Sequence, residues 1–192
     1  KWHTWHWKTN YNINPYNINF TVGNFEVVER IIPSLEKPLN TQFFVLGENR
    51  EGADKLLDHA EIYIDFFTRS FGQYPWLKEK LGIVNTPYLG MEHQTIIAYG
   101  NDYKYNDKGY DFLLFHELAH EWWGNYLSVS DWADFWIHEG FAIYSEALFV
   151  EEKYGLNEYN NFFKKNLLKK IPLNRPVVLD RNSTMKQIMG LD

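Results

Sequence analysis

The chain has 192 residues, enough for one domain with a sizeable core, and 45% of them are hydrophobic, as is ordinary for a globular protein. Its net charge of −6 argues against a nucleic-acid partner, which would need a basic patch. There is no cysteine, so disulfides are excluded and any metal must be held by histidine and carboxylate side chains.

The first fifty residues are rich in asparagine, threonine and β-branched residues. Polar and apolar residues alternate over residues 16–22, which predicts a strand. Gly23 and Asn24 then predict a turn, and residues 25–31 predict a second strand. A third strand is predicted over residues 42–46.

From residue 54 the hydrophobic period becomes that of a helix. Apolar residues recur at helical spacing between residues 56 and 71, and Gly72 is predicted to end this helix. Two short strands are then predicted over residues 81–84 and 94–99, and three helices over residues 110–127, 134–154 and 157–170. Ser183 is predicted to cap a last short helix. Strands therefore precede helices, and we expect an α+β fold.

Residues 116–120 form the pattern HExxH within a predicted helix. Residues four apart share one helix face, so His116 and His120 can reach one metal ion. Glu117 is then placed to accept a proton from metal-activated water. The alternative is a buried helix whose two histidines are satisfied by backbone or carboxylate partners, and HExxH alone leaves both interpretations open.

A carboxylate on the next predicted helix supports the metal interpretation. Eighteen residues, 121–138, separate His120 from Glu139. Two histidines and one glutamate leave a fourth tetrahedral position for water, as in catalytic zinc sites. Glu139 could instead be a surface carboxylate, but its neighbours Trp136, Phe141 and Ala142 are apolar. The metal interpretation is therefore favoured.

This pattern resembles the gluzincin aminopeptidases related to aminopeptidase N. Residues 120–125, His-Glu-Trp-Trp-Gly-Asn, are similar to the family's segment after the second histidine, and residues 136–142 to its segment around the third ligand. Residues 71–75 also fit, and the likeness covers about residues 16–154. The resemblance implies a thermolysin-like catalytic domain, in which a mixed sheet is followed by helices carrying HExxH and the third ligand, with one Zn2+ per chain.

The resemblance also implies a site for the substrate's free amino group. Gly90-Met91-Glu92-His93 lies where the family carries Gly-Ala/Gly-Met-Glu-Asn, so Glu92 is expected to pair with the α-ammonium group. Gly90 and Met91 would shape the first subsite, and His93 replaces the family's usual asparagine. Residues 94–99 would be an edge strand that pairs with an extended peptide. Glu92 could otherwise simply pair with a nearby cation.

His138 stands where the family commonly has asparagine before the third ligand. As the helix neighbour of Glu139 it is expected to point away from the metal.

We expect this sequence to be part of a larger enzyme. Residues 1–22 would be a remnant of a preceding β-domain, and residues 23–192 a zinc metallopeptidase catalytic domain truncated at its C-terminal end. The family's oxyanion-stabilising tyrosine lies further beyond the third ligand than this sequence extends. No apolar run approaches the roughly 18 residues of a transmembrane helix, and no signal-peptide pattern indicates a compartment.

The predicted activity is zinc-dependent removal of N-terminal residues from peptides that have a free amino terminus, with Glu117 as general base. Two alternatives stay open at this point. One is an endopeptidase with the same zinc site, and the other is a zinc-binding fragment without catalysis.

Overall fold

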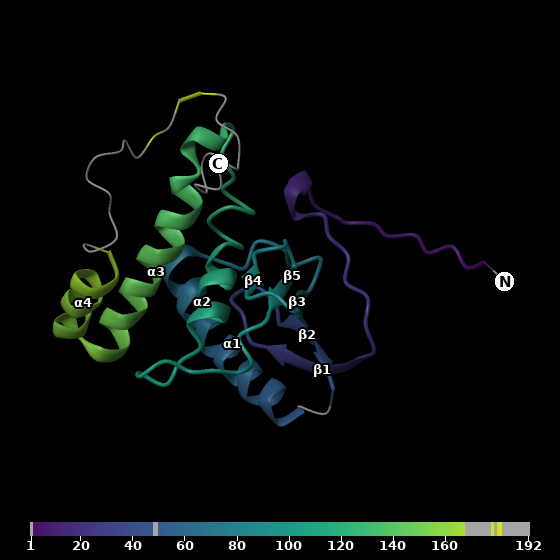
Figure 1. Ribbon diagram of the computed structural model, residues 1–192, viewed down its shortest axis with the longest axis horizontal. Helices are drawn as coiled ribbons and strands as arrows, with labels where there is room; N and C mark the ends of the chain where they lie inside the picture. The colour runs from purple at the N-terminus through teal and green to yellow at the C-terminus, as the bar shows by residue number, and fades with distance from the viewer. Residues whose placement is uncertain (1, 48–49, 168–177, 179, 182–192) are drawn as a thin grey trace. The chain divides into compact units, whose positions relative to one another are not determined.

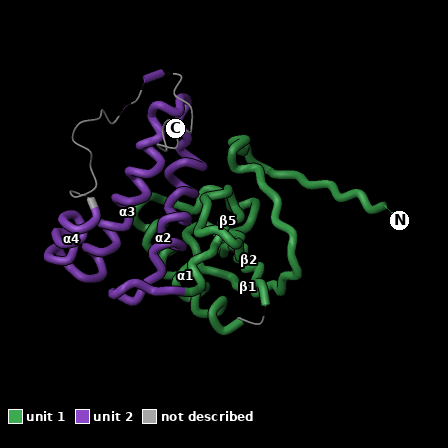
Figure 2. Tube along the Cα trace, in the orientation of Figure 1, with its two compact units in different colours: residues 1–103 green, residues 104–192 purple. Residues whose placement is uncertain are grey.

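The computed structural model describes residues 2–47, 50–167, 178, 180 and 181. The chain divides into two compact units, residues 1–103 and residues 104–192 (Figure 2). Among the described helices, none combines the length and the apolar character that crossing a membrane demands.

Unit 1 is built on a five-stranded mixed sheet with the order β1-β2-β3-β5-β4 (Figure 1). The strands are β1 (Phe25–Ile32), β2 (Leu39–Leu46), β3 (Leu81–Asn85), β4 (Gly90–Met91) and β5 (Ile96–Tyr99). β1 with β2 and β4 with β5 are antiparallel, whereas β2 with β3 and β3 with β5 are parallel. The predicted mixed sheet is confirmed.

Helix α1 (Arg50–Phe71) connects the parallel strands β2 and β3 and packs against β1 and β2. Its apolar stripe, which predicted the helix, is buried together with alternate residues of β2. The helix ends at Gly72, as expected, with a φ of +97° that a residue with a side chain rarely adopts. The buried residues of the stripe include Leu56, Leu57, Ala60, Tyr63, Ile64 and Phe67.

Two predictions for unit 1 are wrong. Residues 16–22 do not form a strand: Pro15–Asn17 is a 3-10 helix, η1, because Pro15 presets a helical φ and the side chain of Asn14 accepts a hydrogen bond from the Tyr16 amide. Residues 18–22 are exposed and have no regular structure. β5 is not an edge strand either, because it lies between β3 and β4.

Unit 2 is helical. It contains α2 (Phe112–Ala119), the 3-10 helix η2 (Trp132–Asp134), α3 (Trp136–Tyr154), α4 (Leu156–Phe162) and a π-helical turn, η3 (Phe163–Leu167). α3 packs against both α2 and α4. Aromatic rings fill the contact, with the ring centroids of Phe115 and Phe149 4.9 Å apart.

Three helix boundaries in unit 2 differ from prediction. α2 was expected to reach residue 127 but ends at Ala119, before a tight turn in which Gly124 has a φ of +129°. α3 begins two residues later than expected, since residues 132–134 form η2. α4 begins at Leu156, directly after Gly155, so Asn157 is not its cap. Residues 168–170 and the short helix expected at Ser183 lie outside the described residues.

Candidate metal centre

Two helices of unit 2 carry the predicted metal ligands. His116 lies in the last turn of α2, His120 is the first residue after it, and Glu139 lies in the first turn of α3. The side chain of Asp111 caps α2 by accepting a hydrogen bond from the Leu114 amide at 2.9 Å, and Asp111 is fully buried.

The three donor groups lie at the spacing that zinc requires. Nε2 of His116 is 3.2 Å from Nε2 of His120 and 3.3 Å from Oε2 of Glu139, and Nε2 of His120 is 3.6 Å from Oε1 of Glu139. Zinc binds nitrogen and oxygen at about 2.0–2.1 Å, so the edge of its tetrahedron is about 3.3 Å. The separation of the two imidazole nitrogens matches that edge, and each nitrogen lies near it from one of the two carboxylate oxygens of Glu139, so the donor set fits a zinc ion.

Neighbouring backbone orients the ring of His120. Its Nδ1 lies 2.9 Å from the carbonyl oxygen of Trp123. A carbonyl can only accept, so Nδ1 carries the proton and Nε2 is left with the lone pair that a metal needs. Gly124 allows this packing, because a Cβ there would lie 3.4 Å from Nδ1 of His120 and 3.3 Å from Nδ1 of His138.

The electrostatics of the cluster favour a positive charge among the three donors. Burial by itself would lower the pKa of His116, but the hydrogen bond to Glu139 and the nearby carboxylates outweigh it and raise the pKa to about 9. Burial would raise the pKa of Glu139, but the hydrogen bond from His116 and the adjacent imidazoles lower it to about 2. A proton and a metal cation thus compete for the same donors.

Glu117 is buried beside the cluster. One of its carboxylate oxygens lies within 4.8 Å of a ring nitrogen of His120. It is not one of the three donors at tetrahedral spacing.

His138 makes a different contact from its neighbour Glu139. Its ring is fully buried, and Nε2 accepts a hydrogen bond from the Val129 amide at 3.1 Å. The side chain therefore ties the loop before η2 to the start of α3.

The predicted amine-binding residues belong to unit 1. Gly90 and Met91 form β4, and Glu92 and His93 follow it and are buried. The phenol of Tyr16 donates a hydrogen bond to Oε1 of Glu92 at 3.3 Å, and Nδ2 of Asn19 lies 2.8 Å from Nε2 of His93.

The sequence did not indicate Tyr16 and Asn19 as site residues, because both lie in the strand that was predicted over residues 16–22. The Asn-Pro pair at residues 14–15 is the signal that could have indicated a helical turn there.

A helix pair that brings two histidines and a glutamate together is typical of zinc metallopeptidases. Comparison with known proteins identifies the family, because residues 56–188 match the model of the peptidase family M1 domain. The chain belongs to peptidase family M1, and its resemblance to the aminopeptidases of that family is confirmed.

Several aminopeptidases are among its relatives. The chain is 27% identical over 156 residues to endoplasmic reticulum aminopeptidase 1 of Mus musculus, covering 76% of this chain and 16% of that protein. It is 29% identical over 150 residues to glutamyl aminopeptidase of Homo sapiens, covering 72% of this chain and 15% of that protein. Subunit 2 of transcription initiation factor TFIID from Schizosaccharomyces pombe is 32% identical over 131 residues, which are 62% of this chain and 11% of that protein. The chain thus spans about a sixth of the length of the first relatives.

Solved structures share the fold. An M1 zinc metallopeptidase from Deinococcus radiodurans superposes with a TM-score of 0.57 at 21% identity, covering 80% of this chain and 35% of that one. Aminopeptidase A of Legionella pneumophila superposes with a TM-score of 0.59 at 16% identity, covering 69% of this chain and 17% of that one.

Proposed function

We propose that this chain is the zinc-binding catalytic part of an aminopeptidase, with one zinc ion held by His116, His120 and Glu139. The tetrahedral spacing of these three donors is the observation that carries the proposal. When bound, zinc polarises a peptide carbonyl and acidifies water. A thermolysin-like catalytic domain over residues 23–192, preceded by a remnant of a β-domain, belongs to the same proposal.

Glu117 is the general base in this proposal. It takes a proton from the attacking water and delivers it to the leaving amine, steps that need a carboxylate close to the site but not bound as a ligand. Its burial beside His120 fits this role. Glu117→Gln should keep the zinc content unchanged and lower turnover by about a hundredfold or more. Normal turnover in that variant would contradict the assignment.

The substrates are peptides with a free amino terminus. Glu92 pairs with the α-ammonium group, Gly90 and Met91 shape the first subsite, and His93 lies beside Glu92. The chain's membership of family M1 and its aminopeptidase relatives support this assignment.

An endopeptidase with the same zinc site is the competing proposal. Comparing one peptide with a free terminus and the same peptide N-acetylated separates the two. An aminopeptidase should cleave only the peptide with the free terminus, because the acetylated peptide has no ammonium group for Glu92 to bind. Equal cleavage of both peptides would favour the endopeptidase.

Zinc binding without turnover is the third proposal, and one relative of this chain is named a subunit of a transcription initiation factor and not a peptidase. The retained Glu117 favours catalysis, because zinc binding itself does not need a carboxylate at that position. A zinc-loaded protein that never hydrolyses aminoacyl anilides would favour binding alone.

A further inference from the structure

Residues 9–19 run along unit 1 as a segment that we call the N-terminal strap. It contacts three consecutive residues, of which the first two, Glu92 and His93, belong to the predicted amine site. Tyr16 donates to Glu92, Asn19 lies against His93, and the carbonyl of Asn12 accepts from Nε2 of Gln94 at 3.1 Å. Glu92, His93 and Gln94 are all buried, so the strap contacts the part of unit 1 that the proposed function assigns to the substrate amine.

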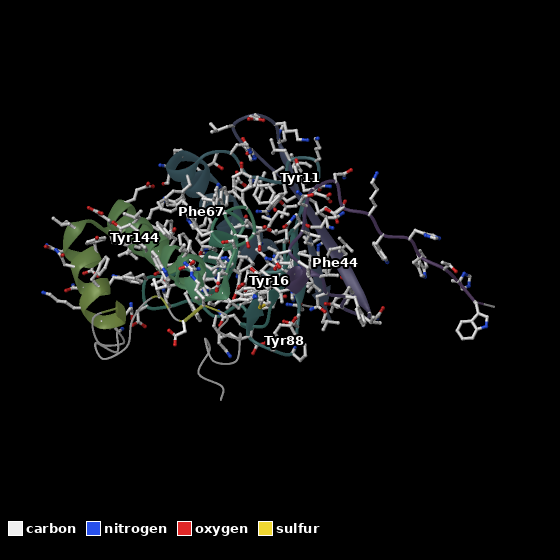
Figure 3. The ribbon with its side chains drawn as sticks, turned by 90° about the horizontal axis from the view of Figure 1, so that it is seen from above. Tyr11, Tyr16, Phe44, Phe67, Tyr88 and Tyr144 are labelled. Carbon is white, nitrogen blue, oxygen red and sulfur yellow. The ribbon has the colours of Figure 1, made fainter. Side chains whose placement is uncertain are left out.

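The strap is also anchored away from this site. Oε1 of Glu79 accepts a hydrogen bond from the Asn10 amide at 2.6 Å. The phenol of Tyr11 accepts one from the Lys78 amide at 3.0 Å, and its ring lies edge-on to Trp76. Figure 3 labels both tyrosines of the strap, Tyr11 and Tyr16, which lie apart from each other. The strap therefore has one tyrosine that only tethers it and another that contacts Glu92.

The local fold of the strap aims Tyr16 at Glu92. The 3-10 helix η1 reverses the chain at Pro15–Asn17, with Asn14 as its cap, and Asn17 is buried at its end. A continuous strand over the same residues would turn successive side chains to opposite faces. The turn instead lets Tyr16 and Asn19, three residues apart, reach the neighbouring residues Glu92 and His93.

We propose that Tyr16 and Asn19 are positioning residues for the amine site, holding Glu92 and His93 in the arrangement that receives the substrate's ammonium group. This inference rests on the proposed role of Glu92. A glutamate has three rotatable side-chain bonds, and a hydrogen bond made before the substrate arrives reduces the freedom lost on binding.

Asn19 has a second consequence. The amide nitrogen of Asn19 can only donate, so Nε2 of His93 accepts and the imidazole is neutral. Burial lowers the pKa of His93, which agrees with the neutral form. A neutral ring beside Glu92 adds no positive charge that would compete with the ammonium group for the carboxylate.

The test measures binding rather than turnover. The zinc-loaded protein carries Glu117→Gln, and calorimetry compares a tripeptide that has a free amino terminus with the same tripeptide N-acetylated. Tyr16→Phe should weaken binding of the free peptide about five- to tenfold and leave the acetylated peptide unchanged. Tyr11→Phe, the matched control, should change the affinity of either peptide by less than about twofold.

Glu92→Gln separates the failure of this inference from the failure of the proposed function. If Glu92→Gln abolishes the preference for the free peptide while Tyr16→Phe behaves like Tyr11→Phe, the positioning role is overturned and the amine site stands. If Tyr16→Phe weakens both peptides equally, Tyr16 is only a tether and the inference is again overturned. If Glu92→Gln leaves the preference intact, both are overturned. Asn19→Ala, at an exposed position, is a second variant. Like Tyr16→Phe, it should weaken binding of the free peptide and leave binding of the acetylated peptide unchanged.

Discussion

Nε2 of His120 lies 3.6 Å from Oε1 of Glu139, although eighteen residues separate the two in sequence. The packing of α2 against α3 brings them together, so the third donor depends on tertiary contact and not on helix periodicity.

Glu139→Ala should therefore remove one of three donors and lower the zinc content from about one ion per chain to well below half an ion after dialysis. The measurement is elemental analysis of the purified protein. Glu152→Ala, at an exposed position of the same helix, is the control and should retain zinc. Full zinc content in the Glu139 variant would show that the ion is held elsewhere.

His138→Asn should keep the zinc, because Nε2 of His138 accepts from the Val129 amide and is not directed to the cluster. The shorter side chain should lower the free energy of unfolding by about 1–2 kcal/mol, since a buried hydrogen bond is altered. His120→Asn should lose the zinc under the same conditions. Elemental analysis and urea unfolding measure the two effects, and zinc loss in His138→Asn would mean that it is a ligand.

Gly124→Ala should destabilise the protein by about 1–3 kcal/mol and weaken zinc binding. The added methyl group meets the rings of His120 and His138, and the φ of +129° is unfavourable for alanine. Gly109→Ala is a matched control, because its φ is +78° but nothing lies within 4 Å of the added Cβ. It should cost about 1 kcal/mol and leave zinc affinity unchanged. Equal effects of the two substitutions on zinc affinity would contradict the steric explanation.

Asp111→Ala should lower the free energy of unfolding by about 1–2 kcal/mol, because α2 loses the acceptor for the Leu114 amide. Asp111→Asn keeps a capping oxygen and should recover most of this loss. Chemical denaturation of the three proteins checks the prediction. A similar loss in both variants would show that the charge of Asp111, and not its capping oxygen, is what matters.

Acid should destabilise unit 1 partly through His93, whose pKa is lowered mainly by burial. A histidine with a lowered pKa in the folded state binds fewer protons there than in the unfolded chain, so its contribution to stability falls as pH drops below about 6.5. Between pH 7.5 and 5.5, His93→Gln should lose less stability than the unsubstituted protein. Urea titrations at the two pH values measure the difference, and identical losses would contradict the prediction.

Local sequence patterns determined a large part of this protein. The four-residue spacing brings His116, in the last turn of a short helix, and His120, its C-cap, to one another, and the apolar stripe of α1 predicted a helix that the structure contains. The spacing to Glu139 and the segments around it led to the family. These features depend on residues close to one another in the chain, where helix and strand periods decide which side chains share a face.

Only the tertiary structure decided the supporting contacts. The carbonyl of Trp123 orients His120 because α2 ends at Ala119, earlier than its apolar pattern predicted. Tyr16 reaches Glu92 across 76 positions of sequence, and a strand-like pattern concealed the turn that brings it there. The first contact depends on where a helix ends, and the second joins residues far apart in the chain, so packing and hydrogen-bond satisfaction decide both contacts rather than local propensity.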